Sequence, residues 1–181
     1  MSKPQPPKKV KLFLSAIYSD RPAWLALLPK LEAKFGESDY SSKEMGFDYT
    51  AYYEEEMGRP LFRQFVSFET LVGPGELAGI KVFTNGLEET SGLDGRRKVN
   101  LDPGYLALDH LVLATGKPAP HRIYLAEGIY ADLHLIYESG GFKPLPWTYP
   151  DYKSESLLGL MNRLREVLKA SLKTGVNPDD D

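Results

Sequence analysis

The order of apolar and polar residues along the chain predicts an alternation of strands and helices. Residues 10–18 form a continuous apolar run, which indicates a buried central strand. Apolar residues recur at helical spacing over residues 24–35, and Pro29 inside that pattern predicts a kink or a split of the helix. Residues 155–172 predict the clearest helix of the chain, capped by Ser154 and buried along a stripe that includes Val167.

The middle of the chain carries weaker patterns. We expect a strand and then a turn or short helix over 37–58, a strand over 61–72, a helix over 77–90 and a short strand over 98–101. Residues 106–115 fit a strand or a helix equally well. Two strands, 122–126 and 129–137, predict a hairpin around Glu127-Gly128. On the second strand, alternation predicts one face shared by Ile129, Ala131, Leu133 and Leu135.

These elements predict an α+β fold with a mainly antiparallel sheet, two or three packed helices, a ferredoxin-like pattern and a C-terminal helix, because neighbouring strands outnumber clean βαβ units. We expect a single domain over residues 10–173. Residues 1–9 are expected to form a flexible leader, and residues 174–181 a disordered tail.

Composition acts mainly by exclusion. The 181 residues include no cysteine, so thiol catalysis, disulfides and cysteine-bound zinc are excluded. The net charge of −3 provides no global basic field, and we expect neither nucleic acid nor a membrane surface as a partner. No run approaches the roughly 18 apolar residues of a membrane span. The N-terminus lacks the apolar core of a signal peptide, and we therefore expect a cytoplasmic protein.

Seven stretches, spread over nearly the whole chain, resemble a known family. They are VKLF near the start, FDYTAYYEEEMG at 47–58, FVSFE at 65–69, KVFTNGLE at 81–88, DGRRKVNLDPGYL at 94–106, HRIYLAEGIYADL at 121–133 and PLPWTYPDY at 144–152. Together they resemble a bacterial and archaeal family of unknown function, number 4416 in the domain-of-unknown-function series. The resemblance implies no activity, although some members carry a "GTP-binding protein" label. The sequence gives that label no support, because it has no G-x-x-x-x-G-K-[ST] loop and no Asn-Lys-x-Asp stretch.

A rigid turn is the first candidate site. Asp102, Pro103 and Gly104 predict a type II turn, because Pro fixes φ at the second position and Gly accepts a positive φ at the third. Such a turn would present Asn100 and Asp102 to a ligand or a metal ion, beside an upstream arginine suited to phosphate or carboxylate. A purely structural turn explains Asp-Pro-Gly equally well, but it leaves Asn100 and the arginines unexplained.

The histidines provide the second candidate. His121 and Arg122 lie where a loop enters a strand, so His121 could act as a general base and Arg122 could hold an anion. Asp132 and His134 share a predicted strand face and suit a divalent metal ion, but two ligands are too few unless His110 joins them. Structural roles, such as a backbone-bonded imidazole and surface ion pairs, remain open for all of them.

Two aromatic groups complete the candidates. Tyr49, Tyr52 and Tyr53 precede three glutamates and could stack on a base or bind a sugar, although their spacing is also typical of a core. Residues 146–152 form a proline-spaced aromatic arm, which either latches onto the sheet or closes a pocket.

We therefore expect a protein that binds a nucleotide or another phosphorylated small molecule, and that could be a metal-assisted hydrolase with a divalent metal ion as cofactor. His121 would be the base and Asp102 a metal ligand. The alternative is a non-catalytic protein-interaction or regulatory module that uses an exposed sheet edge or the aromatic arm. The expected ligand-binding residues are Arg122, Asn100, one of Arg96 and Arg97, Tyr105 and Tyr49, and the weaker expected metal ligands are Asp132 and His134.

Overall fold

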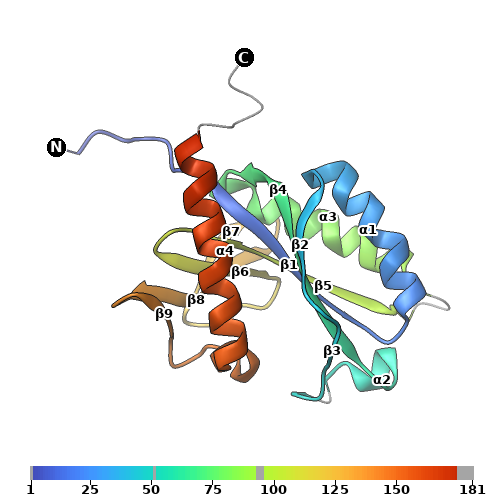
Figure 1. Ribbon diagram of the computed structural model, residues 1–181. Helices are drawn as coiled ribbons and strands as arrows, with labels where there is room; N and C mark the ends of the chain where they lie inside the picture. Colours follow the sequence, from blue (N-terminus) through green and yellow to red (C-terminus); the bar gives the residue numbers. More distant parts are fainter. Residues whose placement is uncertain (1, 51, 93–95, 175–181) are drawn as a thin grey trace.

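The computed structural model describes residues 2–50, 52–92 and 96–174, and within them the chain forms an open nine-stranded antiparallel sheet with four α-helices (Figure 1). The strand order is β2-β4-β1-β5-β6-β8-β7, with β3 paired to β4 and β9 to β8. The strands are β1 (Val10–Tyr18), β2 (Ser38–Ser41), β3 (Met45–Gly46), β4 (Phe62–Val72), β5 (Val99–Leu106), β6 (His110–Thr115), β7 (Arg122–Ala126), β8 (Ile129–Glu138) and β9 (Gly141–Pro144). The helices are α1 (Arg21–Phe35), α2 (Glu54–Met57), α3 (Leu77–Thr90) and α4 (Glu155–Thr174), with 3-10 turns η1 (Pro74–Glu76) and η2 (Pro150–Lys153). The expected α+β class, antiparallel sheet and C-terminal helix are confirmed.

Helices cover both faces of the sheet, with α1 and α3 on one face and α4 on the other (Figure 1). The predicted central strand β1 is buried along its whole length. Leu12 and Leu14 pack with residues of α1 and α3, whereas Phe13 packs with residues of α4. Residues 2–9 form neither helix nor strand, and the expected disordered tail lies outside the described residues except for Thr174, which ends α4.

Helix α1 is continuous through Pro29, so the predicted split is wrong. The Asp20 carboxylate caps the helix by accepting from the Ala23 N–H at 3.0 Å. Pro29 removes the hydrogen bond that would reach the carbonyl of Leu25. Leu25 is half exposed, so water can bind that carbonyl and the helix continues.

The predicted Asp-Pro-Gly turn is also wrong, because Asp102, Pro103 and Gly104 lie inside β5. The N–H and the carbonyl of Leu101 are bonded by side chains of α3. The backbone N–H and C=O groups of odd-numbered residues in β5 therefore point away from β1. Strand β6 pairs with β5 only from Gly104 onward, and the missing N–H of Pro103 therefore lies on an unpaired edge. A Cβ at Gly104 would lie 2.7 Å from the Phe13 ring, so glycine serves close packing here.

The prediction that Ile129, Ala131, Leu133 and Leu135 all share one face of β8 is wrong, because β8 contains a β-bulge. Leu111 pairs with Leu135 and Val112 with Leu133, so His134 is an extra residue. Leu133 consequently packs on the α3 side, whereas Leu135 packs on the α4 side. The predicted hairpin between β7 and β8 is confirmed, with positive φ at Glu127 and Gly128.

Two smaller findings concern the helices. Val167 was expected in the buried stripe of α4, but it is 43% exposed. Among the helices that the structure describes, none has the length and apolar character needed to cross a lipid bilayer.

Candidate functional site

The sheet divides where β5 and β6 separate. Their ladder covers only Gly104–Leu106 on β5 and Leu111–Leu113 on β6. Before Gly104, β5 pairs only with β1, while β6 continues to pair with β8 as far as Thr115. We call this division the seam. The polar residues singled out in the sequence gather along both sides of it.

On the β5 side, α3 supplies the missing partners of the open strand edge. The Glu88 carboxylate accepts the N–H of Leu101 at 2.9 Å, and the Lys81 ammonium donates to the Leu101 carbonyl at 2.7 Å. Lys81 and Glu88 are both buried and lie 3.4 Å apart. Burial raises the pKa of Glu88, although Lys81 and the Leu101 N–H act in the opposite direction. The ion pair therefore replaces a strand at this edge.

Three predicted ligand residues join this ion pair. Arg97 donates to Glu88, and also to Glu56 and Asn100 at 2.9 Å each. The Asn100 amide in turn donates to the Asp102 carboxylate at 2.7 Å. Burial lowers the pKa of Arg97, but the two glutamates outweigh it and the net shift is upward. The guanidinium of Arg97 is thus already neutralised by carboxylates.

The remaining predicted ligand residues lie apart from Arg97. Arg96 is exposed to solvent. Tyr105 faces the α1 and α3 side, and its ring packs edge-on against His110 at 5.7 Å. Tyr49 is exposed and packs against Phe47 at 5.8 Å. The structure therefore brings Arg97, Asn100 and Asp102 together and leaves Arg96, Tyr105 and Tyr49 outside.

On the β8 side, Arg122 binds three partners. Its Nε donates to the buried Asp132 carboxylate at 2.9 Å, its Nη2 to the Tyr149 hydroxyl at 2.9 Å and its Nη1 to the Lys117 carbonyl at 2.8 Å. These bonds fix β7, β8, the preceding loop and the aromatic arm relative to one another. Each of the three guanidinium nitrogens of Arg122 therefore donates a hydrogen bond within the protein.

Two histidines flank the other oxygen of Asp132. His121 Nε2 lies 3.8 Å and His134 Nδ1 3.5 Å from Asp132 Oδ1. His134 Nε2 accepts the Tyr149 N–H at 3.0 Å, so a neutral His134 carries its proton on Nδ1, facing Asp132. Burial alone would raise the pKa of Asp132, but His134 and then Arg122 outweigh burial and lower the pKa below its ordinary value. Asp132 is thus held as a carboxylate.

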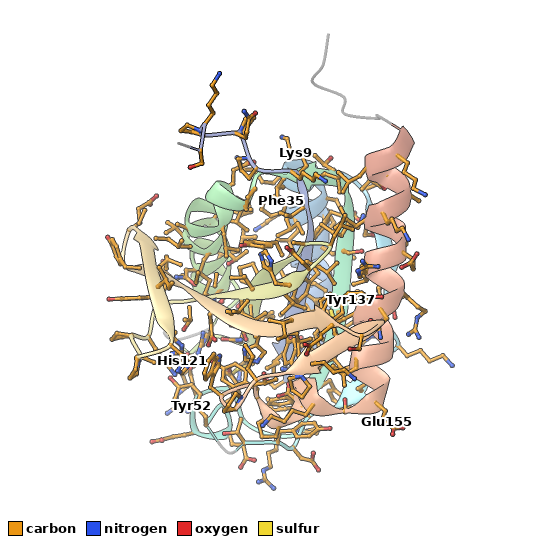
Figure 2. All side chains as sticks on the ribbon, turned by 90° about the vertical axis from the view of Figure 1, so that its left-hand side faces the viewer. Lys9, Phe35, Tyr52, His121, Tyr137 and Glu155 are labelled. Atoms are coloured by element: carbon orange, nitrogen blue, oxygen red, sulfur yellow. The ribbon has the colours of Figure 1, made fainter. Side chains whose placement is uncertain are left out.

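The aromatic arm covers these histidines. The Trp147 ring is stacked on His121 at 4.9 Å and 16°, while Tyr149 and Tyr152 pack edge-on against His134 at 4.5 and 4.9 Å. Figure 2 shows His121 and Tyr52 at the same end of the molecule, where Lys117 Nζ lies 3.9 Å from the centre of the Tyr52 ring. The arm packs on the sheet and at the same time closes the space above the histidines.

The phenol of Tyr149 is influenced by charges from both sides of the seam. Burial raises the pKa of its phenol, Arg122 lowers it, and the carboxylates of Asp132, Asp102 and Asp151 raise it further. The charges of Asp102 from β5 and Asp132 from β8 therefore act on one hydroxyl.

Five buried side-chain atoms in the described part of the chain lack a hydrogen-bond partner, and all belong to residues on the α4 face of the sheet or the arm above it. They are Ser15 Oγ, Arg63 Nε, Asp132 Oδ1, His134 Nδ1 and Tyr152 Oη. Ser15 lies beside Phe65 in the sheet, the Tyr152 ring packs on Phe65 at 6.0 Å, and Arg63 Cζ lies 5.7 Å from the Tyr152 ring centre. Tyr152 also packs on His134, so contacts at η2 link residues that carry these atoms.

Sequence reasoning missed several of these residues, although some left a signal. Arg63 is a buried charged residue two positions before Phe65 on β4, and it forms a buried ion pair with Asp151. Lys81 and Glu88 are seven residues apart, two helical turns, on the apolar stripe of α3. A charge on a predicted buried face was thus the available clue. Ser15 left none, because serine is unremarkable in a strand.

A metal ion would need ligands beyond those the described side chains offer. No group of three or more histidines and carboxylates within residues 2–50, 52–92 and 96–174 is arranged to hold one. His110 pairs along β6 with Ile136, whereas Asp132 pairs with Leu113. His110 is therefore three residues along the strand from Asp132, about 10 Å away. It pairs with Asp109 at 2.7 Å instead, so the suggestion that it joins Asp132 is wrong.

Two open surface hollows are lined by residues other than the polar residues of the seam. One, of about 460 Å³, is lined by residues 19–22, 57–59 and Lys98. The other, of about 320 Å³, is lined by residues 46–48, Glu54 and residues 59–62. Arg59, which lines both, is largely exposed and paired with Glu54 at 2.5 Å. Because these hollows are open to solvent and lack the buried polar groups found at the seam, we take the seam as the candidate site.

An open antiparallel sheet with helices on both faces and a buried polar site at its seam defines a mixed α/β protein. The family described as "Domain of unknown function (DUF4416)" matches residues 8–167, and the chain belongs to this family. The expected family is thereby confirmed. No curated protein and no solved structure matches the chain.

Proposed function

We propose that the protein binds a nucleotide or another phosphorylated small molecule at the seam, beneath the aromatic arm. The observation that carries this proposal is the set of buried donors without an acceptor, namely Ser15 Oγ, Arg63 Nε and Tyr152 Oη. An arginine Nε can only donate, and a buried donor without a partner costs about 1–3 kcal/mol. A ligand rich in acceptor oxygens would relieve this cost.

Phosphate oxygens suit these donors. They accept several charge-assisted hydrogen bonds at once, and they pair well with a guanidinium. Arg63 is already paired with Asp151 through its Nη1, which leaves Nε for a ligand. Entry requires displacement of the arm, because Tyr152 is buried in the present arrangement. The arm is thus both a structural latch and the cover of the proposed site.

His121 is the residue that we assign to chemistry. Its side chain is 23% exposed, and its Nε2 faces Asp132 at 3.8 Å. With the Nε2 proton directed at Asp132, Nδ1 would be free to take a proton from a water molecule or a ligand hydroxyl. For metal-assisted hydrolysis, phosphate oxygens of the ligand would have to complete the coordination of an ion at Asp102. Asp102 would then exchange its contact with Lys81 for the metal.

Removal of single hydroxyls tests the binding site. We expect Tyr152→Phe and Ser15→Ala to fold like the parent, because neither hydroxyl has a partner to lose. Each should weaken binding about 10-fold or more, since a hydrogen bond to a charged group contributes about 1.5–3 kcal/mol. Binding is measured by thermal shift and calorimetry against ATP, GTP, AMP, sugar phosphates and inorganic phosphate. The matched control is Tyr137→Phe, because Tyr137 lies near the end of β8 and packs against Phe142 of β9.

The outcomes separate binding from chemistry. A parent protein that shows no shift with any phosphorylated compound refutes the proposal, as does equal affinity in Tyr152→Phe and Tyr137→Phe. His121→Ala is assayed for phosphate release from any compound that binds. Retained binding with lost turnover supports His121 as the base, whereas unchanged turnover rejects that role.

A further inference from the structure

Strand β7 is the last strand of the sheet and leaves one edge unpaired among the described residues. Its side chains are unusually apolar for such an edge. Ile123 is 71%, Tyr124 57% and Leu125 38% exposed. An exposed apolar edge strand offers both unpaired peptide groups and a hydrophobic surface to another strand.

The opposite edge of the sheet is more polar than β7. Strand β2 has the sequence SDYS, is four residues long, and carries Asp39 near its centre. Strand β7 contains no proline, lysine or carboxylate, and its one charge belongs to Arg122. That charge is paired with Asp132 inside the protein. Apart from the bulge at Leu125, β7 therefore lacks the usual devices against edge-to-edge pairing, namely proline, lysine and an unpaired charge.

We propose that β7 is a self-association surface, on which a second copy of this chain pairs its own β7 in an antiparallel arrangement. Leu125 is bulged relative to β8, so the regular part of the strand is Arg122 to Tyr124. A two-fold axis at Ile123 would pair the Arg122–Tyr124 segments of the two copies. It would place Ile123, the most exposed apolar residue of the strand, at the centre of the interface. The same axis places Arg122 opposite Tyr124.

Charge complementarity favours a second copy as the occupant. Pairing about Ile123 brings no two like charges together, because Arg122 faces an aromatic ring and not another arginine. A two-fold interface uses the same patch on both chains, and this patch is complementary to itself. A strand of five residues buries less than the roughly 1,200 Å² of a standard stable interface. The dimer is therefore weak and reversible.

Sedimentation velocity of the full chain over a range from about 1 to 200 μM tests the dimer. The average mass of the parent should rise from 20.3 kDa toward twice that value as concentration increases. Ile123→Lys should stay at the mass of one chain, because a charge at the axis meets its own copy. Leu25→Lys, which changes an exposed apolar residue on α1, is the matched control and should behave like the parent. A parent that is monomeric throughout, or a dimer that persists in Ile123→Lys, overturns the proposal.

A single cysteine tests the register. The chain has no cysteine, so Ile123→Cys provides one thiol per copy. Directly opposed residues of antiparallel strands have Cα atoms about 4.5–5.5 Å apart, which a disulfide can span. Under mild oxidation Ile123→Cys should form a covalent dimer at least about 10-fold faster than Leu25→Cys, given the effective concentration of paired thiols. Equal rates would overturn the register. Neither result depends on whether the seam binds a phosphorylated ligand.

Discussion

Glu88 should be one of the most costly residues to remove from this protein, although it lies on a helix and not in the apolar core. Its carboxylate accepts the N–H of Leu101, pairs with the buried Lys81 and accepts from Arg97. The substitution Glu88→Leu keeps the side chain about the same size. It leaves the Leu101 N–H without its acceptor, and it leaves the buried Lys81 ammonium with the Leu101 carbonyl and only the more distant carboxylate of Asp102, at the open edge of β5.

The magnitude follows from these two losses. Breaking a buried ion pair by removing one partner costs about 3–5 kcal/mol, and an unsatisfied buried N–H costs about 1–3 kcal/mol. The two terms overlap because the same carboxylate serves both groups. We therefore expect Glu88→Leu to lower the free energy of unfolding by about 4 kcal/mol, a large part of the 5–15 kcal/mol typical of a domain. Glu88→Gln, which keeps an acceptor but not the charge, should cost about half as much.

Urea unfolding monitored by circular dichroism and by fluorescence measures these changes. Trp24 is fully buried and bonded to Gln64, so its emission reports on the α1 side of the sheet. The double substitution Lys81→Met with Glu88→Leu should be more stable than Glu88→Leu alone by at least about 1 kcal/mol, because the buried ammonium that has lost its nearer carboxylate is gone. A free energy for Glu88→Leu within about 1 kcal/mol of the parent would refute the reasoning.

Two further predictions concern the seam. The pKa of Asp132 is lowered below its ordinary value of 3.8 in the folded protein, so its carboxylate contributes stability above pH 3.8 that is lost as the pH falls through the folded pKa. Asp132→Asn should therefore be less stable than the parent near pH 7, and urea titrations at decreasing pH should show this difference shrinking below pH 3.8; a constant difference contradicts the assignment. Gly104→Ala should lower stability by about 1–3 kcal/mol, because its Cβ would lie 2.7 Å from the Phe13 ring and from the Val112 carbonyl. Gly116→Ala, with no atom within 4 Å, is its control, and equal melting temperatures for the two variants would contradict the packing argument.

The sequence predicted correctly those elements whose hydrophobic pattern matches their burial in the structure. The continuous run of β1 and the apolar stripe of α4 are read directly, because burial on both faces or on one stripe leaves a period in the sequence. Local rules failed where tertiary structure decides the outcome. Pro103 and Gly104 favour a turn by themselves, yet an unpaired strand edge accepts the proline and close packing requires the glycine.

The candidate site was predictable in part for a similar reason. His121, Arg122, Asp132 and Asp102 stood out as polar residues near loops or on strand ends, and the structure brings them to one seam. Their partners come from elements that are far apart in the sequence, such as Arg63 on β4 with Asp151 on η2. No pattern within a single segment encodes such a pairing. The extra residue at His134 is likewise invisible to a strict alternation of two.

The short ladder between β5 and β6 has a consequence for how the fold responds to an occupant. Among the described residues, only the Gly104–Leu106 stretch ties the two halves of the sheet by strand pairing, so the relative twist of the halves depends on few bonds. A ligand that touches Ser15 on one half and the Asp132 side on the other acts as a cross-brace between them. Amide hydrogen exchange at Gly104–Leu106 should then slow on binding, far more than in β1. Exchange rates in the sheet would therefore show whether the site is occupied.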